Sequence, residues 1–278
     1  KFERWLSQGG KARRLAAERQ RQLENGQRTL LSRLSETQDS VEHVINTSAL
    51  KSVESIVAKQ RSLGRNLTKT QRDQTAETEA LLQLFREFEP RAPMPSSGRM
   101  AMNPTGLLEM LFLIARKQPR VVLELGSGTS SVWIAYALEK DGGRLISVEH
   151  DTEFAERTKS LLHLHEVSHL AEVRLAELRQ LNINGEEFEW YDVDAFQDLN
   201  DIDLLLVDGP PGSLGETARY PALHVLESRL APNAVVILDD ADRPGEQGIA
   251  RRWITDVAGL RREREIFSRQ AVLTYCRP

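Results

Sequence analysis

Short apolar runs alternate with amphipathic stretches of helical length over the second half of the chain. Five runs have the character of buried strands: Val121–Leu125, Leu145–Val148, Glu172–Leu175, Leu204–Val207 and Ala234–Leu238. Three segments between them have helical patterns: Ser130–Glu139, Thr152–Leu164 and Thr217–Leu230. Strands that alternate with helices at this spacing predict an α/β fold, a doubly wound and mostly parallel sheet with helices on both faces.

The flanks of this region complete a sheet of seven strands. Leu107–Lys117 has the pattern of a helix that leads into the first strand. At the other end, Glu263–Phe267 and Ala271–Cys276 predict two closing strands, one of them antiparallel.

The first 89 residues have a different character. The chain has no proline before Pro90, few aromatic residues, and many Arg, Gln, Glu, Ser and Leu residues. Apolar residues recur mostly in three-, four- and seven-residue steps: Leu23, Leu30, Leu34, Val41, Val44, Val53, Ile56, Leu63 and Leu67. This stripe predicts a long α-helix with a coiled-coil tendency, and hence a homo-oligomer formed through the N-terminal helices. The alternative is a helical hairpin that packs on its own domain.

The proline-rich stretch that begins at Pro90 breaks this helix. The expected organisation is therefore a helical segment over residues 1–89, a linker over 90–104 and a globular domain over 105–278.

The overall charge excludes some partners. The formal net charge is -4 and the pI is about 6.0, so no global field attracts nucleic acid. No apolar run approaches the ~18 residues that span a bilayer, so no transmembrane segment is expected. The single Cys276 suits a reducing compartment. We expect a cytoplasmic location, with peripheral attachment to a membrane-bound assembly as a variant.

A glycine loop follows the first predicted strand. Gly126, Ser127 and Gly128 come directly after it and open a helix, the arrangement in which α/β sheets bind a ligand beyond the carboxyl ends of their strands. A dinucleotide fingerprint requires a third glycine where this chain has Ser131. Glu124, two residues before the first glycine, would repel a pyrophosphate, but it suits a ligand with a cationic end.

An acid also ends the second strand. Glu149 comes directly after the apolar run and is followed by His150 and Asp151. A carboxylate at this place can accept hydrogen bonds from both hydroxyls of a ribose, so Glu149 and His150 are candidate ligand-binding residues. The alternative for Asp151 is a cap of the next helix.

Three further acids follow the fourth and fifth strands. Asp208 ends the run Asp203–Val207, and Asp239 and Asp240 end the last run. Carboxylates that converge repel one another unless a cation neutralises them, and hard oxygen ligands suit Mg²⁺. The alternative is that Asp208 contacts only the cofactor while Asp239 and Asp240 cap a helix.

Taken in order, these motifs resemble the class I S-adenosylmethionine-dependent methyltransferases. The acid after strand four and the Asp-Asp pair after strand five are similar to those of the metal-dependent O-methyltransferases of the catechol and macrocin types. The resemblance implies S-adenosyl-L-methionine as cofactor and Mg²⁺ at Asp208, Asp239 and Asp240. It also implies that Glu124 faces the cationic methionine end of the cofactor and that Ala176 and Glu177 contact its adenine.

The resemblance further implies an acceptor and a base. Asp208 is the candidate catalytic base, as in the sugar-modifying members, because the Gly-Pro-Pro-Gly loop after it offers no lysine. The expected reaction is transfer of a methyl group to a hydroxyl of a sugar, a glycan or a related small molecule. Two alternatives stay open, a metal-independent methyltransferase for small molecules or proteins, and an inactive cofactor-binding scaffold.

Several polar and aromatic residues are secondary candidates. Trp190 and Tyr191 could stack on an acceptor or pack in the core. Arg219 and Tyr220 could gate an acceptor pocket, and Arg243 could bind an anionic substrate. Met100 and Met102 could line the mouth of the pocket or fill a gap in the packing.

Overall fold

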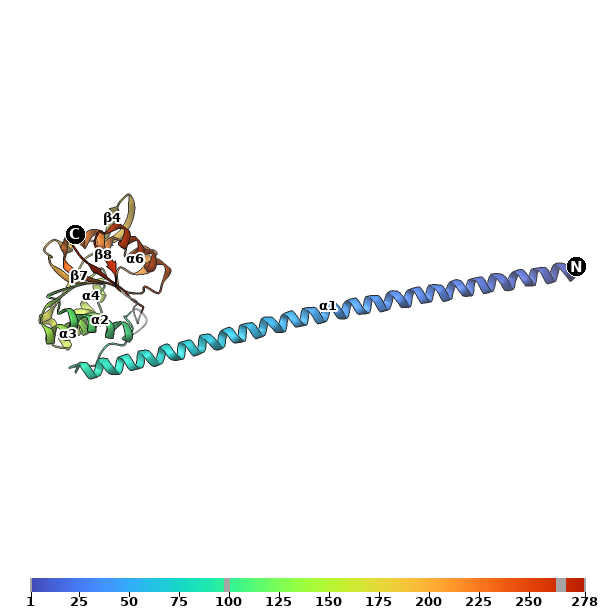
Figure 1. Cartoon of the computed structure of the whole chain (residues 1–278), viewed down its shortest axis with the longest axis horizontal. Helices are drawn as coiled ribbons and strands as arrows, with labels where there is room; N and C mark the ends of the chain where they lie inside the picture. Colours follow the sequence, from blue (N-terminus) through green and yellow to red (C-terminus); the bar gives the residue numbers. More distant parts are fainter. Residues whose placement is uncertain (1, 98–100, 264–268, 278) are drawn as a thin grey trace. The chain divides into compact units, whose positions relative to one another are not determined.

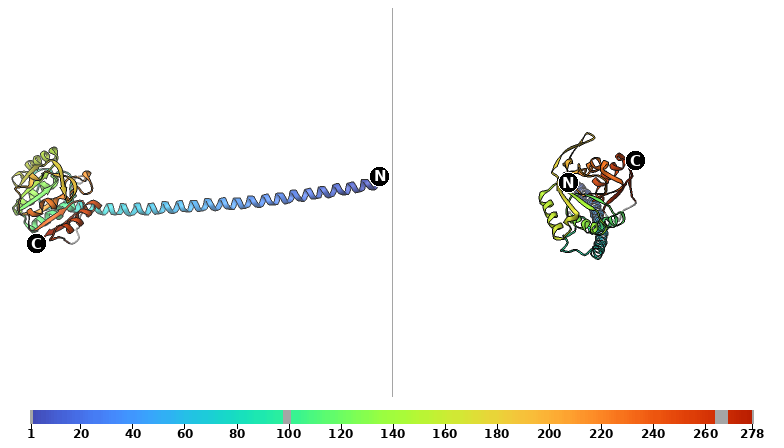
Figure 2. Two further views of the ribbon diagram at one scale, coloured as in Figure 1. Left: turned by 90° about the horizontal axis from the view of Figure 1, so that it is seen from above. Right: turned by 90° about the vertical axis from the view of Figure 1, so that its left-hand side faces the viewer.

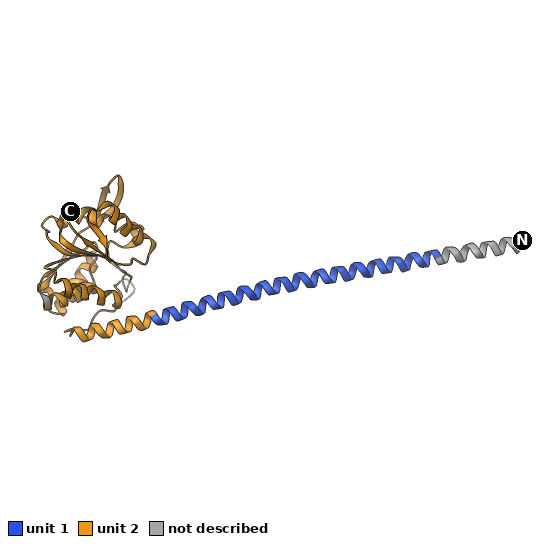
Figure 3. Cartoon of the chain, in the orientation of Figure 1, with its two compact units in different colours: residues 1–72 blue, residues 73–278 orange. Residues whose placement is uncertain are grey.

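The computed structural model describes residues 2–97, 101–263 and 269–277, and their side chains except those of residues 2–17 and 141. The chain divides into two compact units, residues 1–72 and 73–278, which Figure 3 shows in different colours. This division falls inside the first helix, whereas the sequence analysis set it in the proline-rich stretch.

The first unit contains most of one long helix, α1, Phe2–Glu87. Every residue from 18 to 76 is exposed, including the apolar residues of the predicted stripe. Because α1 is uninterrupted, the long helix is confirmed and the hairpin alternative is wrong. None of the described helices is long and apolar enough to cross a membrane.

The last turns of α1 belong to the second unit because their apolar face is buried there. Ala80 and Leu84 are buried within this unit, and so is Phe88, just beyond the helix. The rings of Phe85 and Phe88 approach the edge of Trp133 at 5.7 and 5.8 Å. These contacts explain why the boundary lies before the proline-rich stretch.

A polar contact joins the same turns to the next helix, α2, Pro104–Lys117. The Glu77 carboxylate accepts hydrogen bonds from the Thr105 amide at 2.9 Å, from the Thr105 hydroxyl at 2.9 Å and from Asn103 Nδ2. A carboxylate at the first amides of a helix satisfies groups that lack a partner inside the helix.

The second unit is built around a seven-stranded sheet in the order β3-β2-β1-β6-β7-β9-β8. Its strands are β1 Val121–Leu125, β2 Arg144–Glu149, β3 Ala171–Leu175, β6 Ile202–Val207, β7 Leu230–Leu238, β8 Leu260–Arg262 and β9 Ala271–Tyr275. The first five are parallel, while β9 runs antiparallel to both β7 and β8. The expected doubly wound, mostly parallel sheet is confirmed.

Helices cover both faces of this sheet. The longer ones are α3 Thr129–Asp141, α4 Thr152–Leu164 and α6 Pro244–Asp256. Helices α2, α3 and α4 lie on one face and α6 on the other (Figure 1). Because successive strand residues point to opposite faces, Leu123 and Leu125 join the α6-side core while Val122 joins the α2-side core.

Two predicted elements differ from those observed. The predicted helix Thr217–Leu230 is reduced to α5, Pro221–Leu226, and a 3-10 turn, because Pro221 takes the first helical turn and Leu230 already starts β7. In the tail, β8 lies at Leu260–Arg262, and most of the predicted strand Glu263–Phe267 lies outside the described residues.

A hairpin between β3 and β6 was not predicted. Strands β4 Leu178–Ile183 and β5 Glu186–Tyr191 pair antiparallel and form a two-stranded sheet of their own. They are joined at Asn184 and Gly185, which both have positive φ (54° and 88°), as a tight hairpin turn requires. The hairpin projects from the body of the second unit (Figure 2).

We expect the buried face of the last α1 turns to contribute strongly to stability. Leu84→Ala would remove a fully buried side chain and lower the free energy of unfolding of the second unit by about 2–5 kcal/mol. Leu82→Ala is the matched control, because Leu82 is 66% exposed and its loss should change that energy by less than about 0.5 kcal/mol. Urea denaturation followed by tryptophan fluorescence would measure both, and equal values would contradict the packing described above.

Candidate functional site

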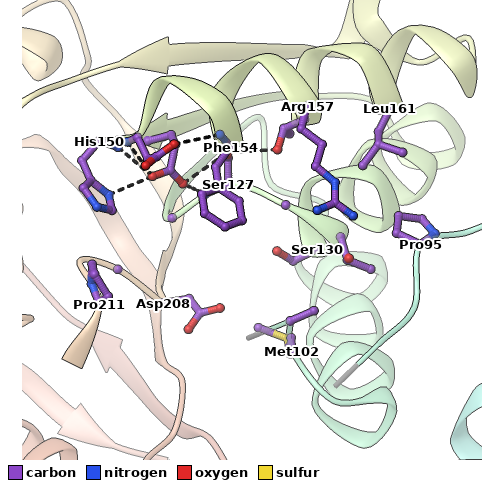
Figure 4. A pocket seen from close by; sticks show the side chains of 18 of the residues that line it. Pro95, Met102, Ser127, Ser130, His150, Phe154, Arg157, Leu161, Asp208 and Pro211 are labelled. Carbon is purple, nitrogen blue, oxygen red and sulfur yellow. Dashed lines mark hydrogen bonds and ion pairs between the residues drawn. The ribbon is translucent and has the colours of Figure 1, made fainter. Parts of the chain in front are cut away.

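A cavity of about 590 Å³ opens at the carboxyl ends of the parallel strands (Figure 4). Its walls come from the loop after β1, the end of β2, the start of α4, the turn after β6 and the segment that precedes α2. The lining residues are Pro95, Ser96, Ala101, Met102, Gly126, Ser127, Gly128, Thr129, Ser130, Glu149, His150, Asp151, Phe154, Arg157, Thr158, Leu161, Tyr191, Asp208, Gly209, Pro211 and Ser213.

The glycine loop forms the floor because its backbone lies against the turn after β6. Gly126 has a φ of 92°, which residues with a side chain rarely adopt, and a Cβ there would lie 3.3 Å from the Asp208 carbonyl carbon. A Cβ on Gly209 would lie 2.1 Å from the Tyr191 hydroxyl. Both glycines are therefore needed for the two turns to meet at the cavity.

Glu124 lies behind this loop and is fully buried. Its carboxylate accepts hydrogen bonds from the hydroxyls of Ser130 and Ser131 at 2.5 Å and of Ser147 at 2.6 Å. Burial outweighs these hydrogen bonds and raises the pKa of Glu124 from 4.5 to about 7. The carboxylate thus joins β1 to β2 and to the first turn of α3. Glu124 is not among the residues that line the cavity, whereas the sequence analysis expected it to contact the cofactor.

Glu149 lies in the wall itself. One carboxylate oxygen accepts hydrogen bonds from the amides of His150 (2.8 Å) and Asp151 (3.0 Å), and the other accepts one from the Ser127 amide (2.9 Å). His150 Nδ1 lies 2.8 Å from the first oxygen. These donors fix the carboxylate beside the glycine loop. Asp151 also caps α4, because its side chain accepts hydrogen bonds from the amides of Glu153 and Phe154.

Asp208, Asp239 and Asp240 form an acid cluster beside the cavity. One carboxylate oxygen from each lies within 4.8 Å of the others, so the structure brings together the three residues that the sequence analysis grouped. Asp208 points into the cavity (Figure 4). Asp240 has a φ of 57°, a strained conformation for a residue with a side chain.

A buried guanidinium lies among these acids. Arg219 is 4% exposed, and its Nη2 lies 3.1 Å from Asp208 Oδ1 and 3.3 Å from Asp240 Oδ2. Asp240 also pairs with Arg243 at 2.9 Å and with Arg269 at 2.7 Å. Arg219 therefore does not gate the pocket from outside, and Arg243 is engaged with an acid of the chain.

Two acids of the cluster, Asp208 and Asp239, have raised pKa values. Burial, and then the charge of Asp239, raises the pKa of Asp208 well above its ordinary value, against the opposing effect of Arg219. Burial and the charge of Asp240 raise the pKa of Asp239. A carboxylate with a raised pKa that faces a cavity is suited to accept a proton from a bound hydroxyl.

The remaining predicted cofactor residues differ in position. Gly126, Ser127, Gly128, Glu149, His150 and Asp208 line the cavity together. Ala176 is buried beside it and donates its amide to the Glu149 carbonyl at 2.7 Å. The Glu177 side chain is 75% exposed and lies 3.6 Å from Arg179.

One part of the lining was missed by sequence reasoning. Along α4, Phe154, Arg157, Thr158 and Leu161 line the cavity, and their three- and four-residue steps after Glu149 were a readable signal of one helix face. Met102 lines the opposite wall, in agreement with its place as a secondary candidate, whereas Met100 lies outside the described residues.

The aromatic residues near the hairpin are mostly structural. Trp190 is fully buried and stacks on Phe196 at 5.4 Å, so it packs in the core. Tyr191 is buried but lines the cavity with its ring edge-on to His150. Tyr220 is also buried, with its hydroxyl donating to Asp256 at 2.7 Å.

Comparison with known proteins agrees with this geometry. Residues 123–241 match the model of a family described as a methyltransferase domain. No curated protein matches the chain.

Solved structures share the fold at low identity. A cofactor-bound protein from MTB is 18% identical with a TM-score of 0.50, over 72% of this chain and 89% of that chain. An SAH-bound methyltransferase from Podospora anserina is 12% identical with a TM-score of 0.50, over 73% and 88%. An O-methyltransferase from Bacillus cereus in complex with SAH is 18% identical with a TM-score of 0.49, over 72% and 90%. At these identities the likeness is one of fold.

We expect the stability of the second unit to depend on pH through Glu124. Because its folded-state pKa of about 7 exceeds the ordinary value of 4.5, the contribution is complete below pH 4.5 and is lost as the pH rises through 7. Relative to Glu124→Gln, the wild-type free energy of unfolding should fall by about 3 kcal/mol between about pH 4 and pH 8. Denaturant titrations at each pH would measure it, and parallel curves for the two proteins would contradict the assignment.

Proposed function

We propose, from the premise that residues 123–241 belong to a methyltransferase domain, that this enzyme transfers the methyl group of S-adenosyl-L-methionine to a hydroxyl oxygen. The observation that carries this proposal is that the Gly126–Gly128 loop, Glu149 and Asp208 line one cavity. Two of the structural neighbours are named as SAH-bound methyltransferases, and one of these as an O-methyltransferase, which supports the cofactor and the oxygen acceptor.

The cofactor would lie across the glycine loop. Glu149 would accept hydrogen bonds from the ribose hydroxyls, because its carboxylate lines the cavity and is held there by three amide donors. The first amides of α3 would meet the methionine carboxylate, since a helix N-terminus favours an anion. This orientation would direct the methyl group toward Asp208.

Asp208 is the proposed base. The acceptor oxygen would attack the methyl carbon, the carbon–sulfur bond would break, and the hydroxyl proton would pass to the Asp208 carboxylate. Its raised pKa, caused by burial and by Asp239, makes this carboxylate a better proton acceptor than an exposed aspartate.

The acceptor class is proposed as a sugar, a glycan or a related small molecule. The support is the Asp-Asp pair at the end of β7 and the loop after Asp208, which has no lysine, as in the sugar-modifying methyltransferases that the sequence resembles. The cavity wall also presents serine and threonine hydroxyls, which suit a polyhydroxylated molecule.

Binding of Mg²⁺ at the acid cluster is a further part of this proposal. The ion would be held by Asp208, Asp239 and Asp240, and it would lower the pKa of an acceptor hydroxyl bound to it. The three carboxylates fit a cation in ligand type and spacing, but Arg219 already bridges Asp208 and Asp240. This observation favours the metal-independent form of the same reaction as the second candidate.

Self-association through α1 is also proposed. The apolar residues of the stripe are exposed over residues 18–72, and burying them would require another helix of matching pattern. A second copy of the same helix has that pattern, so the proposed partner is another copy of this chain.

Cofactor binding should depend on Glu149. Calorimetric titration of S-adenosylhomocysteine into the wild-type chain should give a saturable heat, and Glu149→Gln should weaken the affinity by about tenfold or more because a charge-assisted bond to ribose is lost. Glu153→Gln, exposed in the first turn of α4, is the matched control and should bind as the wild type does.

Absence of any binding to the wild-type chain would refute the proposed cofactor. If binding occurs, incubation with labelled S-adenosylmethionine and a panel of sugars, glycans and phenols would identify the acceptor class. Asp208→Asn should then retain cofactor binding and lose transfer.

Oligomerisation should depend on the α1 stripe. We expect the full chain to sediment as an oligomer, and Leu30→Lys combined with Leu34→Lys to sediment as a monomer, because two charges would enter the apolar contact. Thr29→Lys combined with Ser35→Lys adds the same charge beside the stripe and should leave the oligomer intact. A monomeric wild-type chain would contradict this part of the proposal.

A further inference from the structure

Arg219 is held in the acid cluster by more than its ion pairs. Its Nη2 donates to the Asp208 carbonyl at 2.7 Å, and its Nη1 donates to the Asp239 carbonyl at 3.0 Å. Its Nε lies 3.5 Å from the Pro210 carbonyl. Three backbone acceptors therefore fix the guanidinium independently of the carboxylates.

These acceptors belong to the two turns that carry the cluster. Asp208 and Pro210 follow β6, and Asp239 follows β7, so the guanidinium bridges the carboxyl ends of both strands. Because Arg219 is only 4% exposed, its charge acts where water screens it weakly. The planar group meets several acceptors at fixed angles, which an ammonium could not do.

The same nitrogen lies between two of the three acids. Nη2 approaches Asp208 Oδ1 at 3.1 Å and Asp240 Oδ2 at 3.3 Å, so it occupies the position between carboxylates that a bridging ion would take. Arg243 and Arg269 add positive charge at the outer side of Asp240. Asp240 thus accepts from three guanidiniums, and these occupy most of the lone pairs with which it could bind a metal ion.

We propose that Arg219 is the resident cation of the acid cluster, and that it neutralises and orients Asp208 and Asp240 in place of a divalent metal ion. This inference rests on the proposed methyl transfer and selects its metal-independent form. Arg219 is a positioning residue in this role. It binds Asp208 Oδ1, and it thereby holds the Asp208 carboxylate in the orientation in which this group faces the cavity and can act as the base.

Metal binding itself tests the proposal without an acceptor. In the wild-type chain, the electron paramagnetic resonance signal of free Mn²⁺ should be unchanged by the protein, and the affinity for S-adenosylhomocysteine should be equal in Mg²⁺ and in EDTA. Arg219→Ala should bind Mn²⁺, because three carboxylates then lack their inner counter-charge. At about tenfold above the dissociation constant, Mn²⁺ should raise the melting temperature of this variant by about 4 °C and leave the wild type unchanged.

Arg252→Ala is the matched control. Arg252 pairs with Glu186 at 2.9 Å and lies over the Tyr220 ring, away from the acid cluster, so its loss should create no Mn²⁺ site. Arg219→Lys keeps the charge but not the planar fork, and we expect it to fold and to exclude Mn²⁺.

The wild-type measurement decides the matter even if Arg219→Ala does not fold. Binding of Mn²⁺ to the wild-type chain that Asp240→Asn abolishes would overturn the proposal. A wild-type chain that binds neither Mn²⁺ nor S-adenosylhomocysteine would leave Arg219 as the resident cation and refute the proposed methyl transfer, so the two failures are distinguishable.

Discussion

The parallel pairing of β1 with β6 is the constraint on which the candidate site depends. Leu125 lies beside Val207 in this pair, so the turns that follow the two strands meet, and the strand order reverses at this point in the sheet. The connections leave in opposite directions there, which opens a crevice at the carboxyl ends. Gly126, Glu149 and Asp208 reach one cavity because they end three strands of the same parallel group.

The molecule keeps carboxylates in its interior by two different means. Glu124 is hydrogen-bonded by three hydroxyls, and its burial raises its pKa. The acid cluster instead has an arginine at its centre and two more at its edge. Hydroxyls suit a group that joins structural elements, whereas fixed positive charge suits a carboxylate that must face a cavity in a defined orientation.

Sequence reasoning was strongest where periodicity and strand ends decide position. The runs at Val121–Leu125 and Thr152–Leu164 match the observed elements, and the three acids converge as expected because parallel strands end at one edge. The hairpin was missed although Asn184-Gly185 is a strong turn signal.

Other features were beyond the reach of a linear pattern. The short α5 follows from Pro221, which could have been read. The burial of Leu84 and of Arg219 could not have been read from the sequence, because each side chain is buried by residues that are distant along the chain. Glu124 was assigned to a ligand because its place in the motif is clear from sequence, whereas the three serines around it gather only in the folded chain.

The anchoring of the segment between α1 and α2 has a consequence for where this chain can be cut. Glu77 holds the start of α2, Phe88 packs on Trp133, and the amide of Arg91 donates to Tyr136, so the segment is fastened at both ends before it lines the cavity near Met102. A protease or a cloning design that took the prolines as a domain border would remove the fastening and release one wall of the pocket. The smallest transplantable piece of this protein therefore begins within the helix, ahead of Glu77.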